Sequence, residues 1–146
     1  MKRKRLMTGV LFLLAVLLIV LLTFQNSEKS AELSDRLTDG FARFLWSAGL
    51  MKYDFIRNSG FDYVFVRKLG HTAEYFLLGI ASMLLFRKSR YGLLKAAALC
   101  AVISFSDQII KSFLPGREFD WTDFPYDFFG YVSGTAAAFF FGKKGS

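Results

Sequence analysis

Four long apolar runs divide this chain, and they constrain its fold more than any other feature. They extend over Leu6–Phe24, Leu69–Phe86, Leu93–Ile110 and Phe124–Gly142. The first run contains no charge, and its length of about 19 residues, at 1.5 Å per helical residue, is enough to cross a hydrocarbon core of about 30 Å. The others carry charges only near their ends. We therefore predict an all-α membrane protein built as a bundle of four transmembrane helices.

The predicted organisation is a single domain over residues 1–146. Its helices are expected at 6–24, 67–86, 91–112 and 123–142, with an outer loop at 25–66. The basic start Lys2–Arg5 would also suit a signal peptide. However, the first apolar run is longer than the usual 7–15 residues and no A-x-A-like site follows Phe24, so we predict an uncleaved first helix.

The basic residues predict the orientation of these helices. They precede the first run, fill the turn between the second and third, and end the chain: Lys2, Arg3, Lys4, Arg5, Arg87, Lys88, Arg90, Lys143 and Lys144. The positive-inside rule then places both termini in the cytoplasm. With this topology all 12 acids lie outside or in the outer half, so the net charge of +7 indicates orientation and affinity for anionic lipids. Nucleic acid is not an expected partner, because the cytoplasmic loops are too short to form a reading surface.

The outer loop contains one amphipathic pattern. Over Ser27–Trp46, apolar residues recur at helical spacing while charged residues occupy the other faces. We expect an extracytoplasmic helix between the first two spans, lying on the outer leaflet or capping the bundle. A lid that gates access to a substrate is the alternative.

Ionisable residues gather at the outer ends of the last three predicted spans. His71, Glu74 and Tyr75 open the second, Asp107 and Lys111 end the third, and the fourth begins at Asp123 and Asp127, just after Arg117. The second and fourth predicted helices run from the outer face toward the cytoplasm, and the third runs back to the outer face. These side chains should therefore lie at the same depth, near the outer face of the membrane. Charges at membrane depth cost about 2.5–3.5 kcal/mol each on insertion scales, so they are expected to be paired or functional.

Small residues indicate close helix packing beneath these charges. Gly130, Gly134 and Ala138 form a small-x-x-x-small stripe on the fourth helix, and Gly79 on the second is a possible counterpart. Such residues allow helix backbones to approach closely in lipid. The lone Cys100 is expected to pack as a small apolar residue.

Two blocks of this sequence resemble the signatures of the VanZ-like family. They are R-K-x-x-H-x-x-E-Y-x-x-L-G at Arg67–Gly79 and S-D-x-x-x-x-x-F-x-P-G-R-x5-D-x3-D-x2-G at Ser106–Gly130. The resemblance covers nearly the whole chain and implies a small, multi-helix bacterial membrane protein associated with resistance to the glycopeptide teicoplanin. The matching site residues are Lys68, His71, Glu74, Tyr75, Asp107, Arg117, Asp123 and Asp127.

Two positions depart from that family pattern. The family usually has Asp-Glu where this chain has Asp107-Gln108, and Gln where it has Lys111. One carboxylate is lost and one cation is gained. The change argues against mechanisms that need paired acids on the third helix, including metal binding by carboxylates there.

The cluster allows several chemistries. It can be an ion-pair network that locks the bundle, or Arg117, Lys111 and Lys68 can hold a phosphate or carboxylate, with Arg117 giving a bidentate grip. Acid–base catalysis by His71 with Glu74 or Asp107 is a third reading, although no Ser or Cys nucleophile is recognisable. One histidine with carboxylates would suit Mg²⁺ or Mn²⁺ better than Zn²⁺, but no H-x-x-x-H or Cys pair supports a metal, so we expect no metal and no cofactor.

These patterns and the resemblance lead to one functional expectation. We expect a multi-pass protein of the bacterial cytoplasmic membrane that protects the cell envelope against glycopeptides through a polar site on its outer face. Its partners would be membrane lipids and a lipid-linked cell-wall precursor or lipoglycopeptide. A membrane-embedded enzyme acting on such a precursor, and a purely structural interaction protein, are the alternatives.

Overall fold

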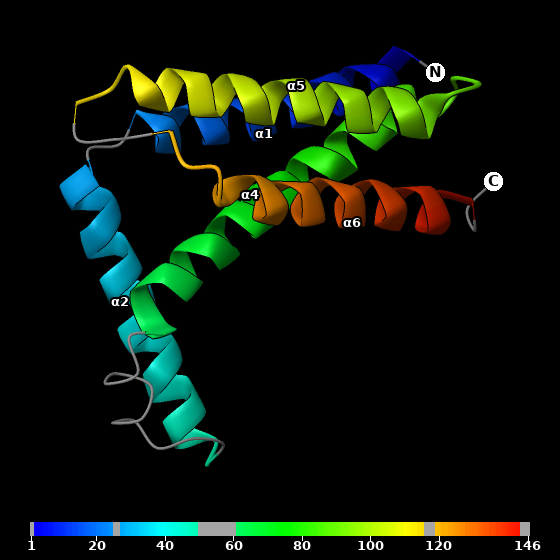
Figure 1. Ribbon diagram of the computed structural model, residues 1–146. Coiled ribbons are helices and arrows are strands. Elements are labelled where there is room, and N and C mark those ends of the chain that lie inside the picture. Colours follow the sequence, from blue (N-terminus) through cyan, green and yellow to red (C-terminus); the bar gives the residue numbers. More distant parts are fainter. Residues whose placement is uncertain (1, 25–26, 50–60, 116–118, 144–146) are drawn as a thin grey trace. The chain divides into compact units, whose positions relative to one another are not determined.

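The computed structural model describes residues 2–24, 27–49, 61–115 and 119–143, and this part of the chain is helical without a strand. Its helices are α1 (Lys2–Thr23), α2 (Ser27–Ser47), α4 (Phe61–Phe86), α5 (Gly92–Ser112) and α6 (Asp123–Lys143). Figure 1 shows them in order along the chain. The prediction of an all-α fold is confirmed. The helix predicted to start at residue 67 begins instead at Phe61, inside the stretch expected to be a loop.

Within the described residues, three helices contain a segment long and apolar enough to cross a membrane. These segments are Leu6–Thr23, Lys68–Phe86 and Gly92–Ser112, with mean hydropathies of 2.9, 1.3 and 1.6. The fourth predicted span corresponds to α6, which is 21 residues long but is not among the three. Its first turns hold Asp123, Pro125 and Asp127, and these polar or helix-disfavouring residues lower its apolar character.

The surface of α1 indicates an apolar environment. Leu6, Leu13 and Leu21 are each more than half exposed on this helix. An apolar surface of this extent is unusual on a soluble monomer, whereas in a bilayer it faces lipid chains. The exposed leucines therefore agree with the use of α1 as a membrane span.

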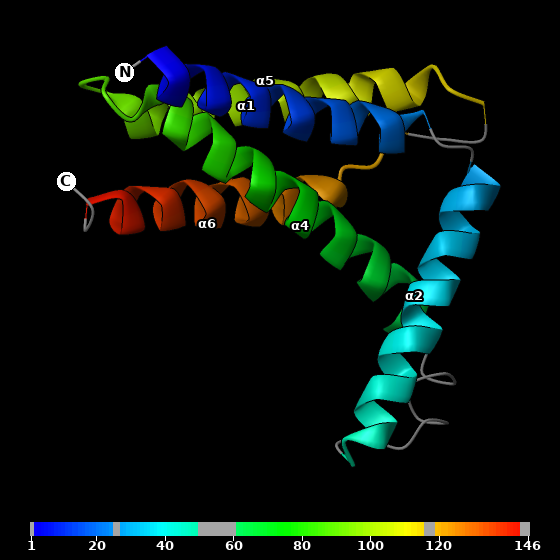
Figure 2. The same cartoon turned by 180° about the vertical axis from the view of Figure 1, so that it is seen from behind.

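The chain divides into two compact units, residues 1–24 with 71–146 and residues 25–70. In the first unit, which we call the bundle unit, α1 and α5 run in one direction and α6 and residues 71–86 of α4 run in the other (Figures 1 and 2). The end of α1, the end of α5 and the start of α6 consequently lie at the same end of this unit. This end is the one on which the ionisable residues converge.

The core of the bundle unit lies where its helices meet. Ile19 of α1, Tyr75 and Leu78 of α4, Cys100 of α5 and Tyr131 of α6 form a buried cluster. Cys100 is not held by packing alone, because its thiol donates to the Ser82 hydroxyl at 3.3 Å. The core therefore contains a polar contact between α4 and α5 in addition to apolar packing.

Glycines allow α4 and α6 to touch through their backbones. A Cβ atom added at Gly79 would lie 2.5 Å from the carbonyl oxygen of Tyr131, and one at Gly130 would lie 2.5 Å from that of Thr72. A Cβ at Gly134 would collide with the Phe76 carbonyl. We call this contact the glycine seam. Ala138, one turn beyond Gly134, is half-buried.

The second unit contains α2 and the start of α4. On α2, the apolar side chains of Leu37, Phe41 and Phe44 recur at intervals of four and three residues and are each about half exposed or more. On another face, Arg36 pairs with Glu32 at 2.8 Å. This apolar face of α2 is open within the unit.

Candidate functional site

Asp107 and Lys111 form a tight ion pair near the end of α5. The Lys111 Nζ lies 2.6 Å from the Asp107 Oδ2, and both side chains are about 5% exposed or less. The two residues are one helical turn apart, which places them on one face. The Thr23 hydroxyl at the end of α1 reaches the other Asp107 oxygen and also lies 2.8 Å from the Ile19 carbonyl. The pair thus joins α1 to α5.

Asp123, the first residue of α6, is the point where three helices meet. Its fully buried carboxylate accepts a hydrogen bond from the Gln108 amide of α5 at 3.2 Å. The same Oδ2 lies 3.6 Å from the His71 Nε2 of α4 and 3.9 Å from the Lys111 Nζ. A carboxylate at this position is also favoured by the positive end of the α6 dipole.

Gln108 connects α5 to the segment before α6. Its amide nitrogen donates to Asp123, and its carbonyl oxygen accepts from the backbone N–H of Asp120 at 3.4 Å. The Asp120 carboxylate in turn accepts from the backbone and hydroxyl of Thr122. A glutamine can both donate and accept here, whereas an ionised glutamate can only accept.

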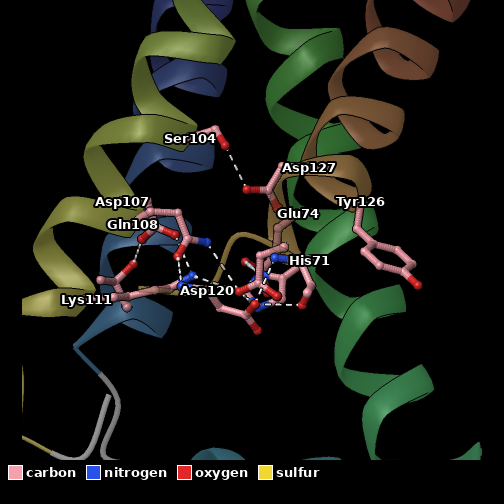
Figure 3. Close-up of polar contacts among 12 residues, drawn as sticks. His71, Glu74, Ser104, Asp107, Gln108, Lys111, Asp120, Tyr126 and Asp127 are labelled. Atoms are coloured by element: carbon pink, nitrogen blue, oxygen red, sulfur yellow. Dashed lines mark hydrogen bonds and ion pairs between the residues drawn. The ribbon is translucent and has the colours of Figure 1, made fainter. Parts of the chain in front are cut away.

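His71 and Glu74 form the more accessible edge of the site. The His71 Nδ1 lies 3.9 Å from the Glu74 Oε2, and the two side chains are 12% and 19% exposed. His71 therefore stands between two carboxylates, that of Glu74 and that of Asp123. We call Thr23, His71, Glu74, Asp107, Gln108, Lys111 and Asp123 together the polar cluster; Figure 3 shows most of its side chains.

Ser104 and Asp127 form a second pair beside the polar cluster, as Figure 3 shows. The Ser104 hydroxyl of α5 donates to the Asp127 Oδ2 at 2.7 Å, and both side chains are buried. Among the described residues, the other Asp127 oxygen and the hydroxyl of the fully buried Tyr75 have no hydrogen-bond partner. Buried polar atoms of this kind are rare and usually have a functional or hydration role.

The structure brings together most of the residues predicted for the site. His71, Glu74, Asp107, Lys111 and Asp123 lie in one network, and Asp127 and Tyr75 lie in the same bundle unit. Lys68 belongs to the start of α4, in the other unit, where it is buried. Arg117 lies outside the described residues, so its predicted contacts stay a prediction.

Sequence reasoning missed two members of the site. Thr23 lies inside the first apolar run, and its hydroxyl near the C-terminal end of that helix was a usable signal. Ser104 has no comparable signal in its sequence surroundings, and the structure gives it a carboxylate partner in Asp127. That partner is not a histidine, so the pair differs from a serine nucleophile with its base.

The ionisable side chains of the described residues indicate what chemistry the site can perform. None of their His, Cys, Asp and Glu side chains form a group of three or more with metal-binding geometry. The Lys111 ammonium is held by Asp107, which reduces its availability for an anionic ligand. His71, between two carboxylates and partly exposed, is the group best placed to exchange a proton with a ligand.

Comparison with known proteins adds one finding. Residues 12–142 match the family described as VanZ/LLP1, which is the family suggested by the two sequence blocks. No curated protein and no solved structure matches the chain. Because the match extends over most of the chain and includes every residue of the polar cluster, the chain belongs to the VanZ/LLP1 family, and three of its described helices are long and apolar enough to cross a membrane.

Proposed function

We propose that the bundle unit crosses the bacterial cytoplasmic membrane four times, with α6 as the fourth span and both termini in the cytoplasm. The alternating directions of the four helices support this topology. The exposed Arg87 and Lys88 lie in the turn between α4 and α5. Asp107, near the end of α5, and Asp123, at the start of α6, lie at the other end of the bundle unit. Basic residues at one end and acids at the other are typical of a cytoplasmic and an outer face.

The second unit contributes an interfacial helix in this proposal. The open apolar face of α2, with Leu37, Phe41 and Phe44 exposed, suits the boundary between the headgroups and the acyl chains of the outer leaflet. A helix of this kind buries its apolar face there while its charged faces stay in water. The helix would anchor the extracytoplasmic segment to the membrane surface.

The polar cluster is proposed to protect the cell envelope against glycopeptides of the teicoplanin type. The observation that carries this proposal is a buried ionic network, drawn from α1, α4, α5 and α6, with a partly exposed edge at His71 and Glu74. A network that only locked helices together would not need an open edge. We propose that a polar headgroup of a lipid-linked precursor or lipoglycopeptide binds at this edge. The proposal assigns the bidentate grip to the planar guanidinium of Arg117, which lies outside the described residues.

A membrane-embedded enzyme acting on a phosphate-bearing lipid precursor is the second candidate. It is favoured by the position of His71, which lies 3.6 Å and 3.9 Å from two carboxylate oxygens. Such an arrangement orients an imidazole for general acid–base work. Turnover of a lipid-linked phosphate substrate by the purified protein, lost in His71→Gln, is the test that separates this candidate from binding alone.

The proposed function is tested in a deletion strain complemented with variants of equal membrane abundance. Deletion should lower the inhibitory concentration of teicoplanin, and the intact gene should restore it. Arg117→Lys should restore less, because an ammonium cannot reproduce the bidentate grip of a guanidinium. Arg43→Lys, at an exposed position of α2, is the matched control and should restore fully.

Two results would contradict the proposal. Unchanged susceptibility on deletion would remove the link to glycopeptides. Full protection by an abundant Arg117→Lys protein would show that no bidentate contact is needed, and would leave the polar cluster as a network that stabilises the bundle.

A further inference from the structure

An apolar groove runs between α1 and α4 in the bundle unit. Its volume is about 260 Å³, and it is lined by four residues of α1 from Leu11 to Leu18 and four of α4 from Leu77 to Leu84. All eight are leucine, isoleucine or alanine. Figure 2 views the unit from the side on which these two helices lie in front. The groove is half open along its length.

The groove leads toward the polar cluster. On α4, Glu74 precedes Leu77 by three residues, which places the acid and the groove on one helix face. On α1, the groove stops at Leu18, five residues or about 7.5 Å before Thr23. In Figures 1 and 2 the two helices diverge in this direction.

The dimensions of the groove indicate what kind of molecule can occupy it. From Leu11 to Leu18 it is about 10 Å long at 1.5 Å per residue, so its volume corresponds to a mean width of about 5–6 Å. A groove of this size with an all-apolar lining can enclose a single hydrocarbon chain, whereas a helix of about 10–12 Å in diameter could insert only its side chains. Both walls belong to candidate membrane spans, where such chains are the surrounding solvent.

We propose that this groove binds one acyl chain of an amphiphile whose polar headgroup rests at the His71–Glu74 edge of the polar cluster. The acyl chain gains little free energy by moving from the surrounding lipid into the groove, because both environments are apolar. It is held there mainly by close packing. The headgroup therefore provides the selectivity. The placement of the headgroup at the His71–Glu74 edge rests on the proposed function. The placement of the acyl chain rests on the groove itself.

Photo-crosslinking of the full chain in lipid nanodiscs tests the proposal. The probe is a phosphatidylglycerol with a diazirine in the middle of one acyl chain, and the labelled peptides are identified by mass spectrometry. Label should concentrate on residues 11–18 and 77–84. Exposed Leu94 on α5 provides the reference for non-selective contact with bulk lipid.

Two variants fill the groove and one serves as their control. Ala15→Phe places a ring in the groove from α1, and Ala81→Leu enlarges the wall on α4. Each should lower labelling of the opposite wall to the level at Leu94. Ala98→Phe, at an exposed alanine of α5, adds the same ring outside the groove and should leave the labelling unchanged. Thermal unfolding establishes whether each variant is folded. If one of the two filling variants does not fold, the labelling of the other one tests the proposal.

Three results would overturn the inference: groove labelling no higher than at Leu94, labelling that persists in a folded filling variant, or an unlabelled groove with cross-links between two protein copies at Leu14. The outcome is distinct from that of the proposed function. If the groove is labelled but deletion leaves teicoplanin susceptibility unchanged, the proposed function fails and the acyl-chain site stands. If deletion sensitises the cell and the groove is unlabelled, only the acyl-chain site fails.

Discussion

Asp123 begins α6 with its side chain fully buried, and three side chains from α4 and α5 approach its carboxylate. A buried charge is tolerable only while its partners remain, because its desolvation is offset by their charges and hydrogen bonds. At the scale of single residues, the polar cluster therefore has little tolerance for neutralisation of this acid.

Asp123→Asn should lower the free energy of unfolding by about 3 kcal/mol, since it removes one of the two carboxylates near His71 and one of the two near Lys111. Thermal unfolding of the purified protein and its abundance in membranes measure the loss. Glu32→Gln breaks an exposed ion pair on α2 instead, and should cost no more than about 0.5 kcal/mol. Equal effects of the two substitutions would contradict the central place of Asp123.

Gln108 is one of the two positions where this chain departs from the family pattern, and the structure gives a reason for the amide. Gln108→Glu would set a carboxylate against that of Asp123 and remove the donor between them, at a cost of about 1–3 kcal/mol. Thermal unfolding measures this cost. The double variant Gln108→Glu/Asp123→Asn exchanges donor and acceptor and should recover part of the loss. A stable single variant would show that the amide is not required.

At the scale of elements, the glycine seam fixes how α4 and α6 approach each other. Gly79 from α4 and Gly130 and Gly134 from α6 each meet backbone atoms of the opposite helix, which cannot move aside as a side chain can. The seam lies next to Tyr75 and begins one turn from Asp127. The position of the polar groups of α6 relative to α4 therefore depends on it.

Gly130→Ala should destabilise the bundle unit by about 1–3 kcal/mol, because the added methyl group overlaps the Thr72 carbonyl and the helices must separate. Thermal unfolding, and loss of protection by the variant in the complemented strain, are the measurements. Gly9→Ala on α1 is the matched control, since nothing lies within 4 Å of an added Cβ there. It should be neutral or stabilising by up to about 1 kcal/mol. Similar losses in both variants would contradict the seam.

At the scale of the whole molecule, the proposed topology puts the turn between α4 and α5 on the cytoplasmic side and the end of α2 on the outer side. Labelling of single cysteines with a membrane-impermeant thiol reagent checks this in intact cells, in a Cys100→Ala background. Ser47→Cys should react and Ser89→Cys should react only after permeabilisation. Reaction of Ser89→Cys in intact cells, with Ser47→Cys protected, would show the opposite orientation.

The sequence by itself determined the helical class, the family and the end of each helix at which ionisable residues lie. These properties depend on the length and composition of single segments and on the spacing of residues along one helix. Both can be read directly from the sequence. The pairing of Asp107 with Lys111 follows from such spacing, since residues four apart share a face. The early start of α4 at Phe61 shows the limit, because the charged residues before the apolar run hid its helical continuation.

Only the tertiary structure decided which groups meet across helices. It joined Thr23 to Asp107, Ser104 to Asp127 and Gln108 to Asp123, and it opened the groove between α1 and α4. A helical period tells which residues share a face, but contact between two helices depends also on their rotation, crossing and distance. For α4 and α6 those quantities are constrained where glycine backbones touch the opposite helix, and no spacing along a single helix specifies them.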